Sequence, residues 1–587
     1  MVIHGTTAVH LTDEIFDQTL NCHHALEGWL TSEAYHDSIE RSIVVAPLLT
    51  SQSARTHRLG PEGEILYSTL DDINNTELGP VFDRIEAHLK IKLVYGFQTV
   101  LHPITRVPSR IETLLLDVRH MNRSIVNTFK RELFEDFGIQ SHRFEHLWQY
   151  EQSVRLAPAA MAALEALNAM DDMTTIISHN YTSVPTLLCA MQKPLCHVTT
   201  VFCAHEVPSI REIVEAHPGH DTMFYNVMGQ ALRENLYIDE VFGEPCHTFQ
   251  HTLTQAASHC HRILASGHNV AREMRFLDPG LQNKTMDIMY DGLAPKKINL
   301  AERHHARNKL KAYCEELLSY TPDWVFSHVA KRIKSKALWR DLRVLSALDR
   351  EFLDTGQTGV MYMVCTDATR RPARDILQME VNYGWPVAHR EGLPDLIGDE
   401  IPVFDLVQAF NARARNIKVL FINQDGFDTE TCGQHMPTGM TPADLRQGTD
   451  VEFCLSIYEP FGSSQLEPMA YGGLCVLNQT CGCTEFFEAV AQGVPQNALI
   501  ADYTNVGDNH PNIEDALRIG QSQRDQVEQT VCGELAEKIW ARLPKTDAES
   551  QALLETGSHL AEQMHWNTII RNYLYPMLQN NLVSTHR

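Results

Sequence analysis

Short apolar runs alternate with longer helical patterns along most of this 587-residue chain. Between the runs lie stretches with helical periodicity, such as 112–137 and 159–170, and a mixed segment at 367–400 that we interpret as a helix followed by a long loop. Parallel strands need long crossover connections, so this alternation predicts a parallel sheet covered by helices on both faces. The expected strands are 41–49, 92–97, 174–179, 197–205, 262–267, 324–330, 359–366, 417–424, 451–458 and 473–479.

The alternation stops at 289–295, where a glycine and a proline interrupt it, and then starts again. A chain of this length exceeds what a single core supports. We therefore predict an α/β protein of two Rossmann-like, doubly wound domains at 1–292 and 293–556. A C-terminal helix at 557–587 is expected to cross back to the first domain. Ligands of such sheets bind at the carboxyl ends of the strands, which predicts a site in a cleft between the domains.

Charge and composition narrow the classes of partner. The formal net charge is −25, which disfavours nucleic acid and anionic membranes as broad-surface partners. No apolar run reaches about eighteen residues, and the N-terminus has neither a basic nor an apolar leader region. The 14 cysteines are scattered, which is typical of a reducing compartment. A cytoplasmic protein without a transmembrane segment is the expectation.

One stretch, YEPFGSSQLEPMAYGG at 458–473, carries the strongest chemical signal. Glu459 and Glu467 stand on either side of a tight turn, after an apolar strand, and a helix is predicted to begin near Ser463 or Ser464. The N–H groups at a helix start suit a phosphate, and flanking carboxylates suit sugar hydroxyls. The simpler alternative is that Glu467 complements the helix dipole and Glu459 is a solvated turn residue.

The same residues, E-P-F-G…L-E-P-M-A-Y-G-G at 459–473, closely resemble the signature of retaining GT-B glycosyltransferases of the glycogen and starch synthase kind. The resemblance implies a GT-B fold. It also implies that Glu467 binds the donor ribose, that Glu459 faces the transferred sugar, and that the N–H groups of Gly462, Ser463 and Ser464 cradle sugar and phosphate. The family's glycine-rich turn corresponds to TCGCTEFF at 480–487.

Such enzymes also carry a cationic pair in the first strand–helix unit of the second domain, where positive charge stabilises the leaving diphosphate. The matching stretch here is 328–341. Lys336 takes the place of the family lysine, and Lys331 stands where arginine is usual, with Arg332 beside it as a substitute. Ala337 replaces one of the family glycines. The alternative is a solvated basic helix start.

In the first domain the resemblance points to two histidines. His205 matches the histidine that contacts the primary hydroxyl of the transferred sugar, although a core histidine is the simpler alternative, and His179 matches a position on the cleft wall. The family's glycine pair after the first strand is replaced by Asn21 and Cys22. We expect Asn21 to tolerate the positive φ that a glycine would supply.

Two other clusters are set aside. The histidines within 247–262 lack a neighbouring carboxylate, so no metal site is predicted there, and 383–396 is interpreted as a packed loop before a carbohydrate-stacking surface.

The leading hypothesis is a retaining hexosyltransferase that uses a nucleotide sugar, with UDP- or ADP-glucose the expected donor, and no cofactor. The acceptor would be a glucan-like glycan or a small molecule. Retention by front-face attack, with the leaving phosphate as base, agrees with the lack of an obvious nucleophile–acid pair. The main alternative is a catalytically reduced relative that binds glucan or nucleotide sugar as a scaffold. Hydrolysis or epimerisation of a nucleotide sugar is a third option, and the sequence does not indicate an oligomeric state.

Overall fold

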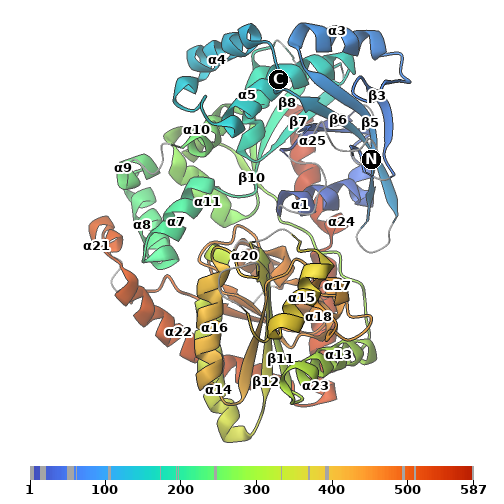
Figure 1. The fold of residues 1–587 in the computed structure, drawn as a ribbon. Helices are drawn as coiled ribbons and strands as arrows, with labels where there is room; N and C mark the ends of the chain where they lie inside the picture. Colours follow the sequence, from blue (N-terminus) through green and yellow to red (C-terminus); the bar gives the residue numbers. More distant parts are fainter. Residues whose placement is uncertain are drawn as a thin grey trace. The chain divides into compact units, whose positions relative to one another are not determined.

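The chain forms two compact α/β units in a computed structural model (Figure 1). The first unit contains Met1–Ile210, Glu234–Ala294 and His565–Arg587, and the second contains Arg211–Arg233 and Pro295–Met564. The described residues are 6–13, 21–48, 58–60, 62–102, 107–171, 173–193, 195, 197–243, 248–331, 333–367, 370–389, 395–491, 496–507 and 511–584.

The first unit is built on a sheet with the strand order β10-β9-β8-β7-β1-β2-β6-β5-β3-β4. From β10 to β6 neighbouring strands are parallel, whereas β5, β3 and β4 extend the sheet in antiparallel pairs. The all-parallel prediction is wrong at this edge, because only residues 102–107 separate β5 from β6, too few for a crossover. The strands are β1 (Thr6–Leu11), β2 (Arg41–Pro47), β3 (Glu64–Ser68), β4 (Ile73–Asn74), β5 (Lys92–Leu101), β6 (Pro108–Asp117), β7 (Met173–His179), β8 (Val198–Ala204), β9 (Arg262–Ala265) and β10 (Met286–Ile288).

The predicted helix at 112–137 is wrong in its first part, which belongs to β6. Leu114, Leu115 and Leu116 are completely buried in the sheet. A continuous apolar run fits a strand buried on both faces as well as it fits a buried helix, so periodicity alone does not separate them. The helix α4 begins only at Arg123, after Asn122, whose side chain accepts a hydrogen bond from the Ser124 N–H.

Helices cover the sheet of the first unit, and they come both from its N-terminal segments and from the residues after His565. They are α1 (Asn21–Leu30), α2 (Glu33–His36), α3 (Gly79–Leu89), α4 (Arg123–Phe137), α5 (Trp148–Ala166), α6 (Val184–Met191), α9 (Ile238–Phe242), α10 (Phe249–Ala256), α11 (His268–Leu277), α12 (Pro279–Gln282), α24 (Trp566–Ile569) and α25 (Tyr575–Ser584), while α7 (Pro208–Ala216) starts in this unit and continues into the second.

The second unit has an entirely parallel sheet with the order β13-β12-β11-β14-β15-β16. Numbered along the chain this is 3-2-1-4-5-6, the order of a Rossmann sheet. The predicted strand at 451–458 is shorter than expected and ends at Cys454. The strands are β11 (Trp324–Lys331), β12 (Gly359–Thr366), β13 (Ile417–Ile422), β14 (Val451–Cys454), β15 (Leu474–Asn478) and β16 (Ala498–Ala501).

Helices lie on both faces of this second sheet (Figure 1). Phe326 of β11 packs in a core with α14, α16 and α22, whereas its neighbour Val325 packs in a core with α13, α15 and α18. This is the alternation that a strand buried on both faces requires. The helices are α8 (His220–Glu234), α13 (Leu300–Leu318), α14 (Leu338–Thr355), α15 (Ala373–Tyr383), α16 (Glu400–Arg413), α17 (Thr429–Cys432), α18 (Pro442–Gly448), α19 (Glu467–Ala470), α20 (Gly482–Ala491), α21 (Ile513–Leu517), α22 (Gln521–Arg542) and α23 (Asp547–Gln563).

The segment 211–233 packs with the second unit although it lies in the first half of the chain. Asp221 at the start of α8 forms an ion pair with Arg340 of α14. The Thr222 hydroxyl donates a hydrogen bond to the Tyr503 carbonyl at 2.8 Å. These contacts connect α8 to α14 and to the segment after Ala501, both of which follow it by more than a hundred residues.

Residues after α23 return to the first unit. Trp566 packs so closely on Gly28 and Gly292 that a Cβ at either glycine would lie within 2.5 Å of the indole. The predicted C-terminal helix at 557–587 is divided, because α23 ends at Gln563 and α24 starts at Trp566. The division of the chain at residue 292 into independent domains stays a prediction.

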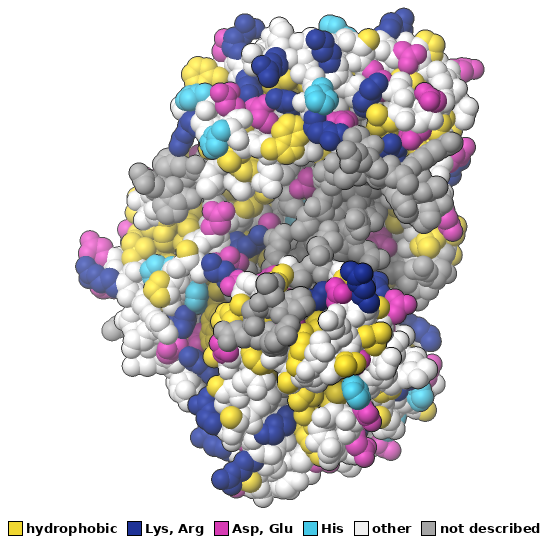
Figure 2. Space-filling model, in the orientation of Figure 1, with side chains coloured by type: hydrophobic (Ala, Val, Ile, Leu, Met, Phe, Trp, Pro, Cys, Tyr) yellow, Lys and Arg dark blue, Asp and Glu magenta, His cyan; other side chains and the backbone are white. Residues whose placement is uncertain are grey.

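No helix in the described part of the chain is long and apolar enough to cross a membrane. Figure 2 shows basic and acidic side chains interspersed over the described part of one face.

Candidate functional site

The second unit has a topological switch point between β11 and β14. These strands are neighbours in the sheet, and the chain leaves them toward opposite edges, first to β12 and later to β15. Ligands of open α/β sheets bind beside the carboxyl ends of strands at such a point. The segments that follow β11 and β14 contain Lys336 and Glu459, two of the predicted site residues.

Lys336 and Glu459 form a buried ion pair at this switch point. Lys336 ends a short 3-10 helix (Ile333–Lys336) after β11 and is 7% exposed, while Glu459 is 6% exposed. Burial alone would lower the pKa of Lys336, but the Glu459 carboxylate raises it above its usual value overall. Lys336 therefore keeps its positive charge beside Glu459, with little water around either side chain.

The turn after Glu459 has a backbone that requires glycine. Gly462 has a φ of 89°, and a Cβ there would lie 2.9 Å from the Glu459 Cγ. The predicted glycine-rich segment at 480–487 forms backbone hydrogen bonds to this turn. The Gly482 N–H donates to the Glu459 carbonyl at 3.2 Å, and the Cys483 N–H donates to the Phe461 carbonyl at 2.9 Å. A Cβ at Gly482 would lie 2.0 Å from the Pro460 carbonyl oxygen, so these two turns fit only with glycine at that position.

Glu467 lies at a helix start, but the helix is shorter than predicted. A 3-10 helix spans Ser463–Gln465, and α19 begins at Glu467 itself and has four residues. The helix predicted to begin near Ser464 is thus two short pieces, whose combined dipole is small. The Glu467 side chain is 40% exposed, and its Oε2 lies 3.2 Å from Nε of Arg446.

Arg446 is a functional candidate that the sequence did not reveal. It lies in α18, and its Nη1 also pairs with the buried Glu452 at 3.1 Å. Both carboxylates keep the pKa of Arg446 above its usual value despite burial, which alone would lower it. No local motif links Arg446 to Glu467, since 21 positions separate them, and only the adjacency of α18 to α19 brings them together.

The other predicted cations are Lys331 and Arg332, and Lys331 pairs with a carboxylate other than Glu459. Lys331, the last residue of β11, is 41% exposed and its Nζ lies 3.3 Å from an Asp425 oxygen. Arg332 lies outside the described residues. Ala337, which replaces a family glycine, is buried and has a φ of 51°. It keeps the left-handed conformation that a glycine would adopt freely, at a cost of about 1–2 kcal/mol.

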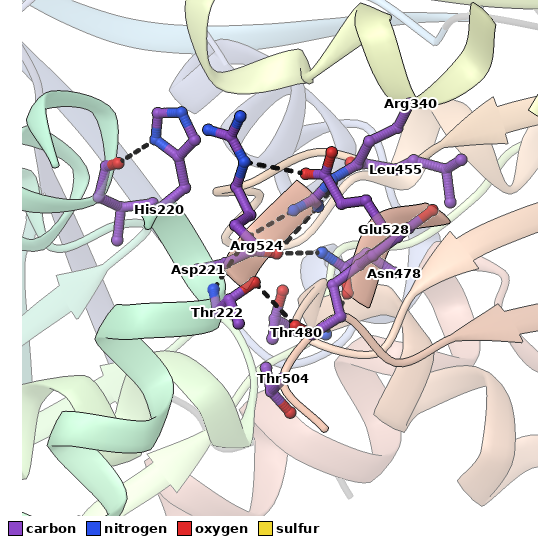
Figure 3. Close-up of polar contacts among 12 residues, drawn as sticks. His220, Asp221, Thr222, Arg340, Leu455, Asn478, Thr480, Thr504, Arg524 and Glu528 are labelled. Atoms are coloured by element: carbon purple, nitrogen blue, oxygen red, sulfur yellow. Dashed lines mark hydrogen bonds and ion pairs between the residues drawn. The ribbon is translucent and has the colours of Figure 1, made fainter. Parts of the chain in front are cut away.

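The segment that leads from β14 to Glu459 is held by a buried charge network (Figure 3). The Arg340 guanidinium donates to the Leu455 carbonyl at 3.1 Å and to both oxygens of Asp221 at 2.6 and 2.9 Å. It also donates to Glu528 at 2.8 Å. The Asn478 amide donates to Asp221 at 2.9 Å and to the Ser456 carbonyl at 2.7 Å, which fixes the two residues after β14.

In the first unit the predicted histidines meet at an equivalent switch point, between β1 and β7. Nδ1 of His179 and Nε2 of His205 are 3.0 Å apart, and Nε2 of His179 is 3.0 Å from Nδ1 of His10 on β1. His10 Nε2 shares a hydrogen bond of 2.7 Å with the Tyr35 hydroxyl, which contacts the Ser42 hydroxyl at 3.0 Å. His179 is 1% exposed and contacts both His10 and His205, and its place on a cleft wall stays a prediction.

Burial keeps the two outer imidazoles, His10 and His205, neutral at pH 7. It lowers the pKa of His205 to about 4 and that of His10 to about 3. Each ring must then donate from one nitrogen and accept at the other. His10 was missed by the sequence analysis because nothing in VHL at 9–11 distinguishes it from a core position. Asn21 is the first residue of α1, so the positive φ expected there is wrong, because an α-helical residue has a negative φ. Residues 14–20 and the Asn21 side chain lie outside the described part of the structure.

No model of a known protein family matches this chain, and no curated protein matches it. Solved structures share its fold. The catalytic domain of starch synthase IV from Arabidopsis thaliana, bound to ADP and acarbose, has 12% identity and a TM-score of 0.53, over 99% of this chain and 100% of that one. An α,α-trehalose-phosphate synthase (UDP-forming) from Burkholderia xenovorans, in complex with glucose-6-phosphate, has 12% identity and a TM-score of 0.50, over 98% and 100%. The α,α-trehalose 6-phosphate synthase from Burkholderia multivorans has 11% identity and a TM-score of 0.50, over 99% and 98%.

These solved structures are of GT-B glycosyltransferases. The chain accordingly has an α/β fold of the GT-B class with two Rossmann-like sheets, as predicted. At this level of identity the likeness establishes the fold, while activity depends on the residues of the site.

Proposed function

We propose that this protein is a retaining glycosyltransferase that moves a hexosyl unit from a nucleotide sugar to a glycan or small acceptor. The observation that carries the proposal is the buried Lys336–Glu459 ion pair at the switch point of a Rossmann sheet. Burying two charges costs desolvation free energy that their attraction only just offsets. Such an ion pair therefore contributes little net stability compared with apolar packing. Its position beside a glycine-dependent turn favours a role in binding or chemistry.

Each site residue has a role in that reaction that its environment supports. Lys336 supplies positive charge in a poorly hydrated place, where it would stabilise the charge that develops on a leaving diphosphate. Glu459 keeps Lys336 oriented and can accept hydrogen bonds from hydroxyls of the transferred sugar. Gly462 allows the backbone to approach a ligand without a side chain in the way.

Glu467 is the proposed contact to the ribose of the donor. Its side chain is 40% exposed, so a vicinal diol can reach it while Arg446 holds it in one orientation. Ser463 and Ser464 come just before it, and the first N–H groups of a 3-10 helix have no acceptor within that helix. In the first unit, His205 is half-buried and neutral, and we propose that it contacts a hydroxyl of the transferred sugar. We propose UDP- or ADP-glucose as donor, with no cofactor taking part in the transfer itself.

A second candidate is a binding protein of the same fold without turnover. It is favoured by Lys331, which stands where the family has arginine and whose charge is partly balanced by Asp425 at 3.3 Å. A lysine cannot make the two-pronged contact that arginine makes with a phosphate. Against it, Ala337 keeps a left-handed backbone that only a demanding local arrangement would retain.

The experiment is a donor screen. The chain is incubated with UDP-, ADP- and GDP-sugars, with and without a glucan primer, and release of nucleoside diphosphate is measured. We expect release with UDP- or ADP-glucose. Glu459→Ala should lower turnover more than nucleotide affinity, because its proposed partner is the moving sugar. Glu488→Ala, which removes an exposed carboxylate on α20, is the matched control and should leave both unchanged. A folded protein that binds nucleotide but releases no diphosphate from any donor would favour the binding protein.

A further inference from the structure

We propose that His179, Cys203 and His205 form a binding site for one zinc-class divalent cation in the first unit. One ring nitrogen of each histidine and the Cys203 sulfur all lie within 4.8 Å of one another. His179 ends β7 and is in register with Cys203 on β8. His205 lies just after the end of β8, two positions beyond Cys203. Neighbouring strands therefore present three ligands at one edge of the sheet.

The distances suit zinc. Zinc binds imidazole nitrogen at about 2.0–2.1 Å and thiolate at about 2.3 Å, so two nitrogens at a tetrahedral angle are about 3.3 Å apart. His179 Nδ1 and His205 Nε2 are 3.0 Å apart, and a shift of a few tenths of an ångström would admit the ion between them. Two imidazoles and a thiolate select zinc-class ions over Mg²⁺ and Ca²⁺, which prefer oxygen ligands. Three protein ligands leave a fourth position for water or another ligand.

The three proposed ligands differ in exposure, which leaves a route for the ion from solvent. His179 and Cys203 are each 1% exposed, whereas His205 is partly exposed. Cys203 forms no disulfide. The two inner ligands are therefore fixed by packing, and the outer one lies where a cation can enter from solvent.

A supporting shell for one ligand already exists. A histidine that binds a metal through one nitrogen usually donates its other N–H to a fixed acceptor. His179 with Nδ1 toward the ion would donate from Nε2 to His10 Nδ1, 3.0 Å away. His10 would then donate from Nε2 to Tyr35, which would donate to Ser42. All donors and acceptors along this chain are satisfied when they run in that one direction.

The backbone between the ligands is strained. Asn180 has φ 68° and ψ −179°, a region that essentially only glycine occupies, and such a residue costs about 1–3 kcal/mol. Its N–H donates to the Cys203 carbonyl at 3.0 Å, and its side-chain oxygen accepts from the His205 N–H at 3.3 Å. One strained residue thus connects the backbones of all three proposed ligands. Strain of this kind persists only where the surrounding structure holds it, and it clusters at ligand sites.

The proposal goes beyond the proposed function and does not rest on it, because the metal itself is measured. The full chain is stripped with a chelator and titrated with Co²⁺, which reports thiolate ligation by a charge-transfer absorption in the near ultraviolet. We expect one Co²⁺ per chain with this absorption, and its loss when Zn²⁺ is added, since Zn²⁺ displaces Co²⁺ at such sites.

Variants separate this site from the other cysteines. Cys203→Ser should abolish the charge-transfer absorption, and His205→Gln should weaken Co²⁺ affinity by at least tenfold. Tyr35→Phe, which shortens the supporting shell, should weaken affinity by about 10- to 100-fold. Cys260→Ser, another buried thiol of the first unit, is the matched control and should keep the absorption.

Thermal unfolding in chelator shows whether each variant is folded, and His205→Gln, at a partly exposed position, keeps the test valid if Cys203→Ser does not fold. The absence of a thiolate absorption at stoichiometric Co²⁺, or its persistence in Cys203→Ser, would overturn the proposal.

Discussion

Replacing Arg340 by methionine should destabilise the second unit strongly, because it removes a cation that two buried carboxylates share. Arg340, Asp221 and Glu528 are all completely buried (Figure 3). Methionine keeps most of the aliphatic volume but removes the guanidinium, whose carbon lies 3.9 Å from the Tyr503 ring centroid. The change therefore tests charge more than shape.

The size of the expected stability loss depends on which partners Asp221 and Glu528 keep in the Arg340→Met variant. Glu528 keeps Arg343 at 2.7 Å and Arg524 at 3.6 Å, so it remains compensated. Asp221 keeps the neutral Asn478 amide at 2.9 Å and no cation among the contacts found in the described residues. Removing one partner of a buried pair costs about 3–5 kcal/mol. At 1.4 kcal/mol per factor of ten, this lowers the folding equilibrium constant by roughly a hundred- to several-thousand-fold.

Urea unfolding, followed by far-ultraviolet circular dichroism and by tryptophan fluorescence, measures the loss. Two transitions must be fitted if the units unfold separately. Arg343→Met is the matched control, because Arg343 is 31% exposed and pairs with Glu528 and Asp525. Such a partly solvated pair should contribute about 0–1 kcal/mol. Adding Asp221→Asn to Arg340→Met should recover at least half of the loss, since no buried charge is then stranded. A loss below about 1 kcal/mol for Arg340→Met, or an equal loss for Arg343→Met, would refute this reasoning.

Three further predictions concern the second unit. Glu467→Ala should weaken UDP or ADP binding about 10- to 100-fold by calorimetry, the loss expected for hydrogen bonds to a charged group, and an unchanged affinity would contradict the ribose assignment. Burial alone would lower the pKa of His328, but the bonded Asp341 carboxylate, 2.6 Å away, raises it above 6.5 overall. The folded state therefore holds a proton on His328 that the unfolded state releases. This contribution to stability is complete below pH 6.5 and is lost as the pH rises through the folded pKa of His328. The urea midpoint should fall over the same pH range, and His328→Asn should remove that fall. Ala337→Gly should stabilise the unit by about 0–1 kcal/mol, because relief of the left-handed strain exceeds the added freedom of the unfolded chain, and a clear loss of stability would show that the alanine methyl is needed there.

Much of the fold and part of the site could be predicted from local patterns. Within the described residues, apolar runs predicted five of the ten strands of the first sheet and five of the six strands of the second, because burial on both faces requires an unbroken apolar segment. The same rule failed at 112–117, where leucines allow strand or helix alike. Glu459 and Glu467 were found because turn, glycine and carboxylates are adjacent in sequence. The length of the helix after Ser463 was not predicted correctly, because a cap pattern indicates where a helix starts, whereas tertiary packing decides how far it continues.

The alternation of strands and helices and the turn at 459–462 were determined by the sequence itself, because each depends on neighbours along the chain. The partners of the charged groups were decided only by the tertiary structure. Lys336 reaches Glu459 across 123 positions, and His10 reaches His179 across 169. Arg340 binds Asp221, which precedes it by 119 positions on a helix of the other half of the chain. Parallel sheets bring the carboxyl ends of distant strands to one edge, and a charge buried there is stable only beside whichever counter-charge the topology delivers.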